Sequence, residues 1–249
     1  TSLLDGCLEF LIPNYKRGSP WHYEKIEYSK DLYTDAHTIM QNILNKTNYV
    51  DGRKKLNFKS YKSGIEFYSL ESNGRTTFRL HIYRKLLEQQ DKNYTLSSSE
   101  YLLVENMYHV EAQIFSSRIS TLSSQMGVSN GSIEDFSLPF IEDTIIKNHL
   151  SSIYGEQPYR KRQDVIAIIN ASNNLTAYKK KQLIHILDQI NQSSLLSARN
   201  KYKGKERLFD SCIRTIRNLG INLIYIPYDS TVSLFPALTE LIFNLGGLS

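Results

Sequence analysis

Two segments of this 249-residue chain alternate strictly between apolar and polar side chains, and this alternation limits the fold more than any other feature. In residues 76–83 the apolar side chains are Phe78, Leu80 and Ile82, and the polar ones are Arg79, His81 and Tyr83. In residues 107–115 the apolar side chains are Val110, Ala112 and Ile114, and the polar ones are His109, Glu111 and Gln113. Successive side chains of a β-strand point to opposite faces of a sheet, so both segments are predicted to be half-buried strands. If they share a sheet, the side chains expected to converge on one solvent-facing surface are Tyr83, His81, His109 and Glu111.

The residues before the first of these strands predict an antiparallel meander. Leu56–Tyr61 and Ile65–Leu70 are strand-like runs separated by a tight turn at Ser63–Gly64, and the Ser72–Asn73–Gly74 turn leads into residues 76–83.

The N-terminal residues predict one strand and one helix. A strand is expected at Cys7–Ile12, and the polar and aromatic stretch from Pro13 to Lys30 is expected to lack regular structure. A helix capped by Thr34 or Asp35 is expected next, because its apolar residues recur at helical spacing. These residues are Ala36, Ile39, Met40, Ile43 and Leu44.

The second half of the chain predicts helices. They are expected at Pro139–Ile153, Arg160–Ala171, Thr176–Asn191 and Lys205–Leu219, after a loop at Gly127–Ser137. Gly220 stands where a left-handed residue would end the last helix. Residues 193–221 resemble a helix–turn–helix with Gly204 in the turn, although an ordinary helical hairpin fits the same pattern. The expected fold is α+β: an antiparallel-sheet catalytic domain over residues 1–155 and a basic helical region over residues 156–249.

Basic charge is concentrated in that helical region. The chain has a net charge of +5, but residues 160–217 hold 13 Lys/Arg against 4 Asp/Glu, a net of +9, which leaves −4 for the rest. Such a concentration predicts a phosphate-binding face, and a solvated helical surface is the alternative. The predicted DNA-binding residues are Arg160, Lys161, Arg162, Lys179, Lys180, Lys181, Lys203, Lys205, Arg207 and Arg214, with Arg79 from the sheet.

The cellular location is predicted from cysteine use and hydropathy. Cys7 and Cys212 lie far apart in apolar surroundings, which favours two buried thiols in a reducing compartment. No apolar run approaches the roughly 20 residues of a membrane span, and the first residues lack the order of a signal peptide. A cytoplasmic protein without a membrane partner is therefore expected. The chain opens on Thr1 rather than Met, in strand-like sequence that leads into Cys7–Ile12, so an upstream piece is expected as well.

The polar strand faces carry residue types that suit phosphodiester transesterification. Attack by a tyrosine phenolate keeps the phosphate activated, so that a free hydroxyl can later reverse the reaction without a nucleotide cofactor. A phenol has a pKa near 10 and needs a metal or a cation such as Lys85 to ionise. Asp5, His109 and Glu111 lie on predicted strands and are ligand types that suit Mg²⁺ or Mn²⁺. The same residues also fit ordinary packing of Tyr83 and a surface ion pair between Lys85 and Glu88.

The order of these features resembles the filamentous-phage and plasmid replication initiators of the gene II/gene X family. Members carry a strand that ends in a Tyr-x-Lys-x-x-Glu element, matched here by Tyr83, Lys85 and Glu88. A later strand with an Arg-x-Glu-x-Arg-like core is matched by Glu111, with His109 and Gln113 in place of the arginines. The closing IRTIRNLGINLIYIP is similar to the family's Leu-x-x-Leu-Gly-Ile-like end, and the resemblance covers about residues 56–227.

The resemblance implies a rolling-circle nickase that cuts one origin strand, becomes linked to the 5′ phosphate through Tyr83 and leaves a 3′ hydroxyl for the polymerase. Lys85 would then steer the phosphate or help to ionise the phenol, and Glu88 would orient Lys85. Asp5 would match an acidic metal ligand of the family. The family has an arginine close to this ligand, and Leu3 stands in its place here. The family's implied partners are origin DNA and the host helicase and polymerase, in a bacterial cytoplasm.

Several alternatives remain open at the level of sequence. The His-hydrophobe-His metal motif of many rolling-circle enzymes is absent from these residues, which leaves an upstream motif, other ligands or an inactive protein. Related initiators of plasmids and conjugative elements would perform the same nicking. A gene X-like product or repressor would bind DNA without cutting it, and a structural phage protein would not bind DNA at all.

Overall fold

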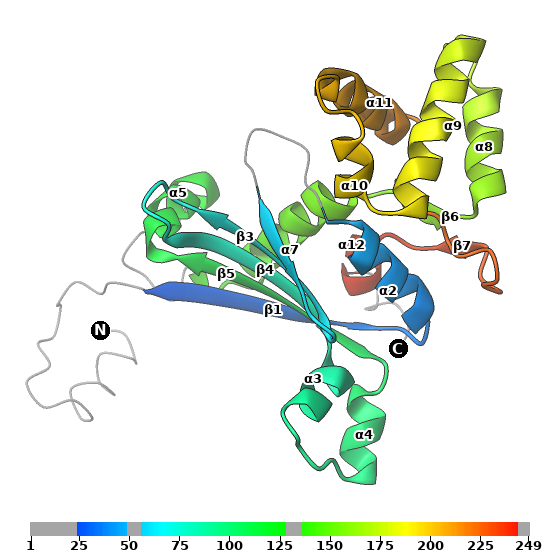
Figure 1. The fold of residues 1–249 in the computed structure, drawn as a ribbon. Helices are drawn as coiled ribbons and strands as arrows, with labels where there is room; N and C mark the ends of the chain where they lie inside the picture. The colour runs from blue at the N-terminus through cyan, green and yellow to red at the C-terminus, as the bar shows by residue number, and fades with distance from the viewer. Residues whose placement is uncertain (1–23, 49–55, 128–135, 244–249) are drawn as a thin grey trace, which may run out of the picture.

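A five-stranded antiparallel sheet forms the centre of the structure, a computed structural model that describes residues 24–48, 56–127 and 136–243 (Figure 1). The strands are β1 (Lys25–Tyr33), β2 (Asn57–Ser60), β3 (Gly64–Leu70), β4 (Thr76–Arg84) and β5 (Met107–Phe115). Their order across the sheet is β1-β5-β4-β3-β2, and each neighbouring pair is antiparallel. Both the predicted meander, β2-β3-β4, and the α+β class are therefore confirmed.

Strand β1 corrects the prediction that the chain is irregular up to Lys30. Tyr28 and Leu32 point into the core, but Lys30 stands between them on the same face and hides the strand periodicity. Its ammonium group is accommodated by ion pairs of 3.3 and 3.0 Å with Glu142 and Asp143 of a covering helix. The strand expected at Cys7–Ile12 lies outside the described residues.

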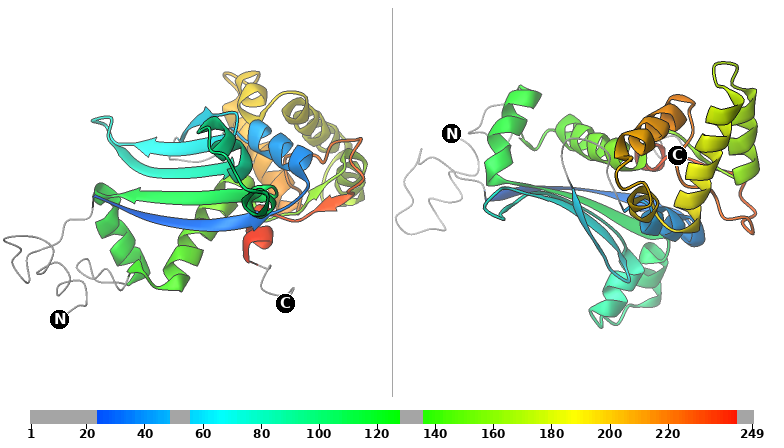
Figure 2. Two further views of the ribbon diagram at one scale, coloured as in Figure 1. Left: turned by 90° about the horizontal axis from the view of Figure 1, so that it is seen from below. Right: turned by 45° about the horizontal axis from the view of Figure 1, so that its top comes forward.

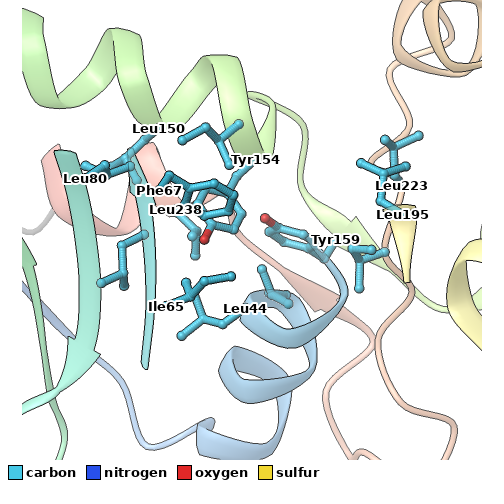
Figure 3. Packing of buried hydrophobic residues seen from close by; sticks show 14 of the residues in the cluster. Leu44, Ile65, Phe67, Leu80, Leu150, Tyr154, Tyr159, Leu195, Leu223 and Leu238 are labelled. Carbon is cyan, nitrogen blue, oxygen red and sulfur yellow. The ribbon is translucent and has the colours of Figure 1, made fainter. Parts of the chain in front are cut away.

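Helices cover one face of the sheet. They are α2 (His37–Lys46), α5 (Ser116–Met126), α7 (Pro139–Tyr154) and α12 (Leu238–Phe243). The apolar side chains of β3, β4 and β5 point toward this layer, and Figure 3 shows Phe67 and Leu80 packed beside Leu150 and Tyr154. Figure 2 shows α5 and α7 on one side of the sheet and the α3–α4 excursion on the other. The opposite face is therefore left to polar side chains.

The start of α2 differs from the prediction. The helix begins at His37 after Ala36, and no side chain caps its first turn. Thr34 Oγ1 instead accepts a hydrogen bond of 3.1 Å from the backbone N–H of Ala36. The apolar positions that predicted the helix do lie in the core, so burial rather than capping sets its place.

Two short helices interrupt the chain between β4 and β5. Helix α3 (Lys85–Asp91) follows β4 without a break, and α4 (Ser98–Val104) begins with a reciprocal capping box between Ser97 and Glu100. Both contact β5, and α3 also contacts β4. This excursion brings the Lys85–Glu88 segment to the end of the sheet where Tyr83 lies.

The C-terminal helices gather beyond one end of the sheet (Figure 1). They are α8 (Arg162–Ala171), α9 (Ala177–Gln192), α10 (Leu195–Asn200) and α11 (Glu206–Asn218). Helix α8 starts two residues later than predicted because β6 (Tyr159–Arg160) pairs with β7 (Leu234–Phe235). Gly220 has a φ of 73°, as its predicted role at the end of α11 requires. Residues 128–135 of the expected loop lie outside the described residues.

Polar contacts join these helices to the sheet layer. Asn42 Nδ2 donates to the carbonyl of Tyr225 at 3.0 Å, and the backbone N–H of Leu196 donates to Asn48 Oδ1 at 3.0 Å. Near the end of the chain, α12 returns to contact β1 and α7. Residues after 155 thus contribute to the sheet layer, and the boundary at residue 155 stays a prediction.

Candidate functional site

A row of aromatic rings crosses the polar face of the sheet. The pairing of β4 with β5 sets Tyr83 opposite His109 and His81 opposite Glu111. The Tyr83 ring centre lies 4.5 Å from that of His81 and 5.3 Å from that of His109. The four side chains that the alternation predicted to converge therefore share one surface.

Carboxylates surround this row. Asp31 Oδ1 lies 2.7 Å from His109 Nδ1, and Glu27 and Glu111 both accept a hydrogen bond from the Gln113 amide. Glu66 stands opposite His81 on β3. Glu27 and Asp31 were not predicted as site residues because β1 was not predicted, although each directly precedes a core residue, Tyr28 or Leu32, in the sequence.

Arg79 is the basic residue of this face that was predicted to bind DNA. Its Nη1 donates to Gln113 Oε1 at 3.3 Å, and its Nε lies 3.5 Å from Glu66 Oε1. The guanidinium group is therefore held by partners within the sheet. The face around Tyr83 is acidic rather than basic.

Tyr83 itself is less accessible than a solvent-facing strand position predicts. Its side chain is only 6% exposed, and its hydroxyl makes no hydrogen bond with the residues that the structure describes. Burial raises the pKa of Tyr83 above its ordinary value of 10.0, and the nearby carboxylates, led by Glu88 and Glu111, raise the pKa further. The phenol is therefore protonated at neutral pH unless a cation or a base acts on it.

Lys85 is placed beside Tyr83, as its position in the motif predicts. Its Nζ lies 5.5 Å from the centre of the Tyr83 ring and 2.9 Å from Glu88 Oε2. Burial opposes ionisation of Glu88, but hydrogen bonds from Lys92 and Lys85 outweigh it and lower the pKa of that carboxyl. Because Glu88 offsets much of the charge of Lys85, this lysine alone is a weak activator of the phenol.

His81 adds a candidate base to the row. Burial lowers the pKa of its imidazole, so the ring is neutral at neutral pH. Its Nε2 atom is buried and finds no hydrogen-bond partner among the described residues. Sequence spacing placed His81 on this face but assigned it no role.

The predicted metal ligands are brought together only in part. Asp5 lies outside the described residues, and no three His, Cys, Asp or Glu side chains in the described part of the chain are grouped to hold a metal ion. Magnesium is commonly bound by one or two protein carboxylates together with water and substrate phosphate. Glu27 and Glu111, which share the Gln113 amide, are the described carboxylates that match this requirement.

Gly64 determines how Tyr83 is packed. A Cβ atom at this position would lie 2.0 Å from the carbonyl oxygen of Ile82 and 2.7 Å from Tyr83 Cβ, so no side chain fits between β3 and β4 here. We expect Gly64→Ala to lower the free energy of unfolding by about 3 kcal/mol, measured by urea denaturation. The neighbouring turn variant Ser63→Ala is the control and should change it by less than about 1 kcal/mol. Equal stability of Gly64→Ala and the wild type would contradict the packing described here.

The predicted DNA-binding residues of the helical region fall into two groups. In one group the side chains have internal partners: Lys161 bonds the Ser230 carbonyl, Arg162 pairs with Asp188, Lys179 bonds Cys212 and Gln182, and Lys180 bonds the Asn170 carbonyl. The exposed group comprises Lys181, Lys203, Lys205, Arg207 and Arg214. Arg160 belongs to neither group, because it lies in β6 and is partly buried.

The cysteine prediction is tested at one of its two positions. Cys212 is a free buried thiol, as predicted, and Cys7 lies outside the described residues.

Comparison of the chain with family models, with curated proteins and with solved structures finds no match. In the described ranges, no helix is both long enough and apolar enough to cross a membrane. The geometry of the sheet face and the helical region is therefore the basis for a functional assignment.

Proposed function

We propose that this protein initiates rolling-circle DNA replication by nicking and religating one origin strand through a phosphotyrosine intermediate. The observation that carries the proposal is the placement of Tyr83 between two histidines on a carboxylate-lined sheet face that the layer of α2, α5, α7 and α12 leaves free. A nucleophile, a neutral base and candidate cation ligands on one surface match the needs of phosphodiester transesterification.

The proposed reaction uses the residues of this row in different roles. Tyr83 Oη attacks the phosphorus, forms the bond to the 5′ phosphate and displaces the 3′ oxygen as a free hydroxyl. Neutral His81 accepts the phenolic proton, and the departing 3′ oxygen takes up a proton from water to become the hydroxyl. Lys85, oriented by Glu88, steers the phosphate. Attack of the 3′ hydroxyl on the phosphotyrosine reverses these steps and reseals the strand.

The proposal includes Mg²⁺ or Mn²⁺ as cofactor. Bound at this face, the ion would offset the charge of the phosphate and favour the phenolate. Glu27 and Glu111 are the described carboxylates that would hold it, together with the phosphate, and the roles of His109 and Asp5 as ligands stay predictions. The supporting observation is the excess of carboxylates around the Tyr83 phenol, whose pKa is raised by burial and then further by these carboxylates.

The adduct itself provides the test. The protein is incubated with Mn²⁺ or Mg²⁺ and a pool of labelled random single-stranded oligonucleotides, denatured, and separated from unbound DNA. Digestion and mass spectrometry of the retained protein should locate the nucleotide on Tyr83. A covalent link at another tyrosine, or no link with DNA that the protein demonstrably binds, would refute the nickase proposal.

A non-catalytic DNA-binding protein is the second candidate. It is favoured by the burial of Tyr83 and the raised pKa of its phenol, which leave the hydroxyl unreactive without help. Such a protein would retard DNA in a gel and leave no link after denaturation.

Under the nickase proposal the protein works in the cytoplasm of a bacterial host. A host helicase would unwind the duplex there, and a host polymerase would extend the 3′ hydroxyl that the nick leaves.

A further inference from the structure

Helix α11 exposes one polar stripe along its length. Arg207, Arg214 and Asn218 are exposed, and together with the half-buried Ser211 they follow one another at spacings of four, three and four residues. At 3.6 residues per turn these positions share one face of the helix. The opposite face is buried through Phe209, Cys212, Ile213 and Ile216.

This surface keeps a net positive charge, because residues 199–217 hold seven Lys/Arg against Glu206 and Asp210. Glu206 accepts a hydrogen bond from the backbone N–H of Gly204 at 2.9 Å, and Asp210 lies 3.5 Å from Arg199. Asp188 of α9 is occupied by Arg162. Glu206 thus keeps its negative charge close to Lys203, whereas Asp210 and Asp188 lie next to Arg199 and Arg162. Those left without an ion pair among the described residues are Lys201, Lys203, Lys205, Arg207 and Arg214.

Helices α10 and α11 are joined by a short turn, which is the connectivity of a helix–turn–helix. Helix α10 ends at Asn200, the chain turns through Gly204 with a φ of 82°, and α11 begins at Glu206. Both helices contact α9, and Figure 1 shows the three helices side by side beyond the sheet. In this motif the second helix presents its outer face to DNA while the others support it.

We infer that α11 is a recognition helix that lies in the major groove of double-stranded DNA. The major groove admits an α-helix. Arginine forms two hydrogen bonds with guanine there, and asparagine forms two with adenine. Arg207, Arg214 and Asn218 read base edges, and the lysines of the turn contact phosphates. The stripe spans about 16 Å at 1.5 Å per residue. The inference rests on the proposed function, because it names the surface by which the initiator finds its duplex origin.

Selection from a pool of short random DNA duplexes tests the inference. The wild type is expected to enrich one sequence motif. Arg214→Ala and Arg207→Ala should each lower affinity for that motif by about tenfold to a hundredfold and relax the base preference at one position. Lys203→Ala should weaken binding to all duplexes alike. It should also reduce the slope of log affinity against log salt concentration by about one, the loss of one phosphate contact.

Arg75→Ala is the matched control, because Arg75 is an exposed arginine in the turn between β3 and β4. It should bind the enriched motif as the wild type does. If the double variant of Arg207 and Arg214 binds the motif with wild-type affinity, the inference is overturned. Enrichment of no motif by the folded wild type would overturn it as well.

The nickase proposal and this inference fail in different ways. Tyr83→Phe should bind the enriched duplex with unchanged affinity, because Tyr83 lies on the sheet and not on α11. Motif binding without any covalent adduct would therefore refute the nickase alone. If the wild type forms the adduct but the α11 variants keep full affinity for the motif, only the recognition-helix inference is refuted.

Discussion

Tyr83→Phe is expected to lower formation of the covalent protein–DNA adduct by about a thousandfold or more, because it removes the attacking oxygen and nothing else. The substituted ring keeps its place between His81 and His109 and keeps the contact with Lys85. The measurement is the fraction of labelled DNA that stays with the protein after denaturation. Loss of the adduct with intact DNA binding would assign the hydroxyl a chemical role.

Tyr68→Phe is the matched control for this experiment. Tyr68 lies on the same face of β3 and pairs across the sheet with Arg79, so its substitution removes a hydroxyl from the same surface. Adduct formation should remain at the wild-type level. Because the Tyr83 hydroxyl makes no hydrogen bond within the described residues, Tyr83→Phe should also change the free energy of unfolding by less than about 1 kcal/mol. A Tyr83→Phe variant that still forms the adduct would exclude this tyrosine as the nucleophile.

Phe67→Ala is expected to cause the largest loss of stability, about 3–5 kcal/mol. Phe67 on β3 is 1% exposed and meets the ring of Tyr154 edge-on, with ring centres 6.1 Å apart. Figure 3 shows it where the sheet, α7 and Leu238 of α12 come together. Removing the ring leaves a cavity that these elements close only in part. Urea denaturation followed by circular dichroism measures the loss.

Phe140→Ala provides the comparison for Phe67→Ala. Phe140 is 54% exposed near the start of α7, so truncating it removes a phenyl ring without opening a buried cavity. Its free energy of unfolding should fall by less than about 1 kcal/mol. Equal losses in the two variants would mean that Phe67 does not occupy the centre of the core.

The sheet and its two-sided character were predictable from periodicity alone. Strands β4 and β5 alternate cleanly, so the sequence shows which side chains share a face, and a register of antiparallel strands then pairs Tyr83 with His109. The major helices were predictable for the same reason. Strand β1 escaped detection because Lys30 stands at a core-facing position, where it forms ion pairs with Glu142 and Asp143 of a helix distant in sequence.

Long-range contacts determine which charged side chains are neutralised by an ion pair, and the sequence alone does not show this. Arg162 was predicted to bind DNA with the other cations of the helical region, but Asp188, 26 residues later, binds it through two hydrogen bonds of 2.7 Å. Arg207 and Arg214 form no ion pair among the described residues, whereas Asp210 lies 3.5 Å from Arg199. A count of charges cannot distinguish these cases, since neutralisation depends on distance in space.

The same distinction applies to Tyr83. Its alternation with Leu80 and Ile82 determined the face on which it lies, because strand geometry depends on the local backbone. Its burial depends on the bare backbone of Gly64 on one side, His109 on the other and α3 at the strand's end. Burial raises the pKa of its phenol, and carboxylates from α3, β5 and β1 raise this pKa further. Position on a face is a local property of the chain, whereas exposure and acidity come from residues that only the folded structure brings together.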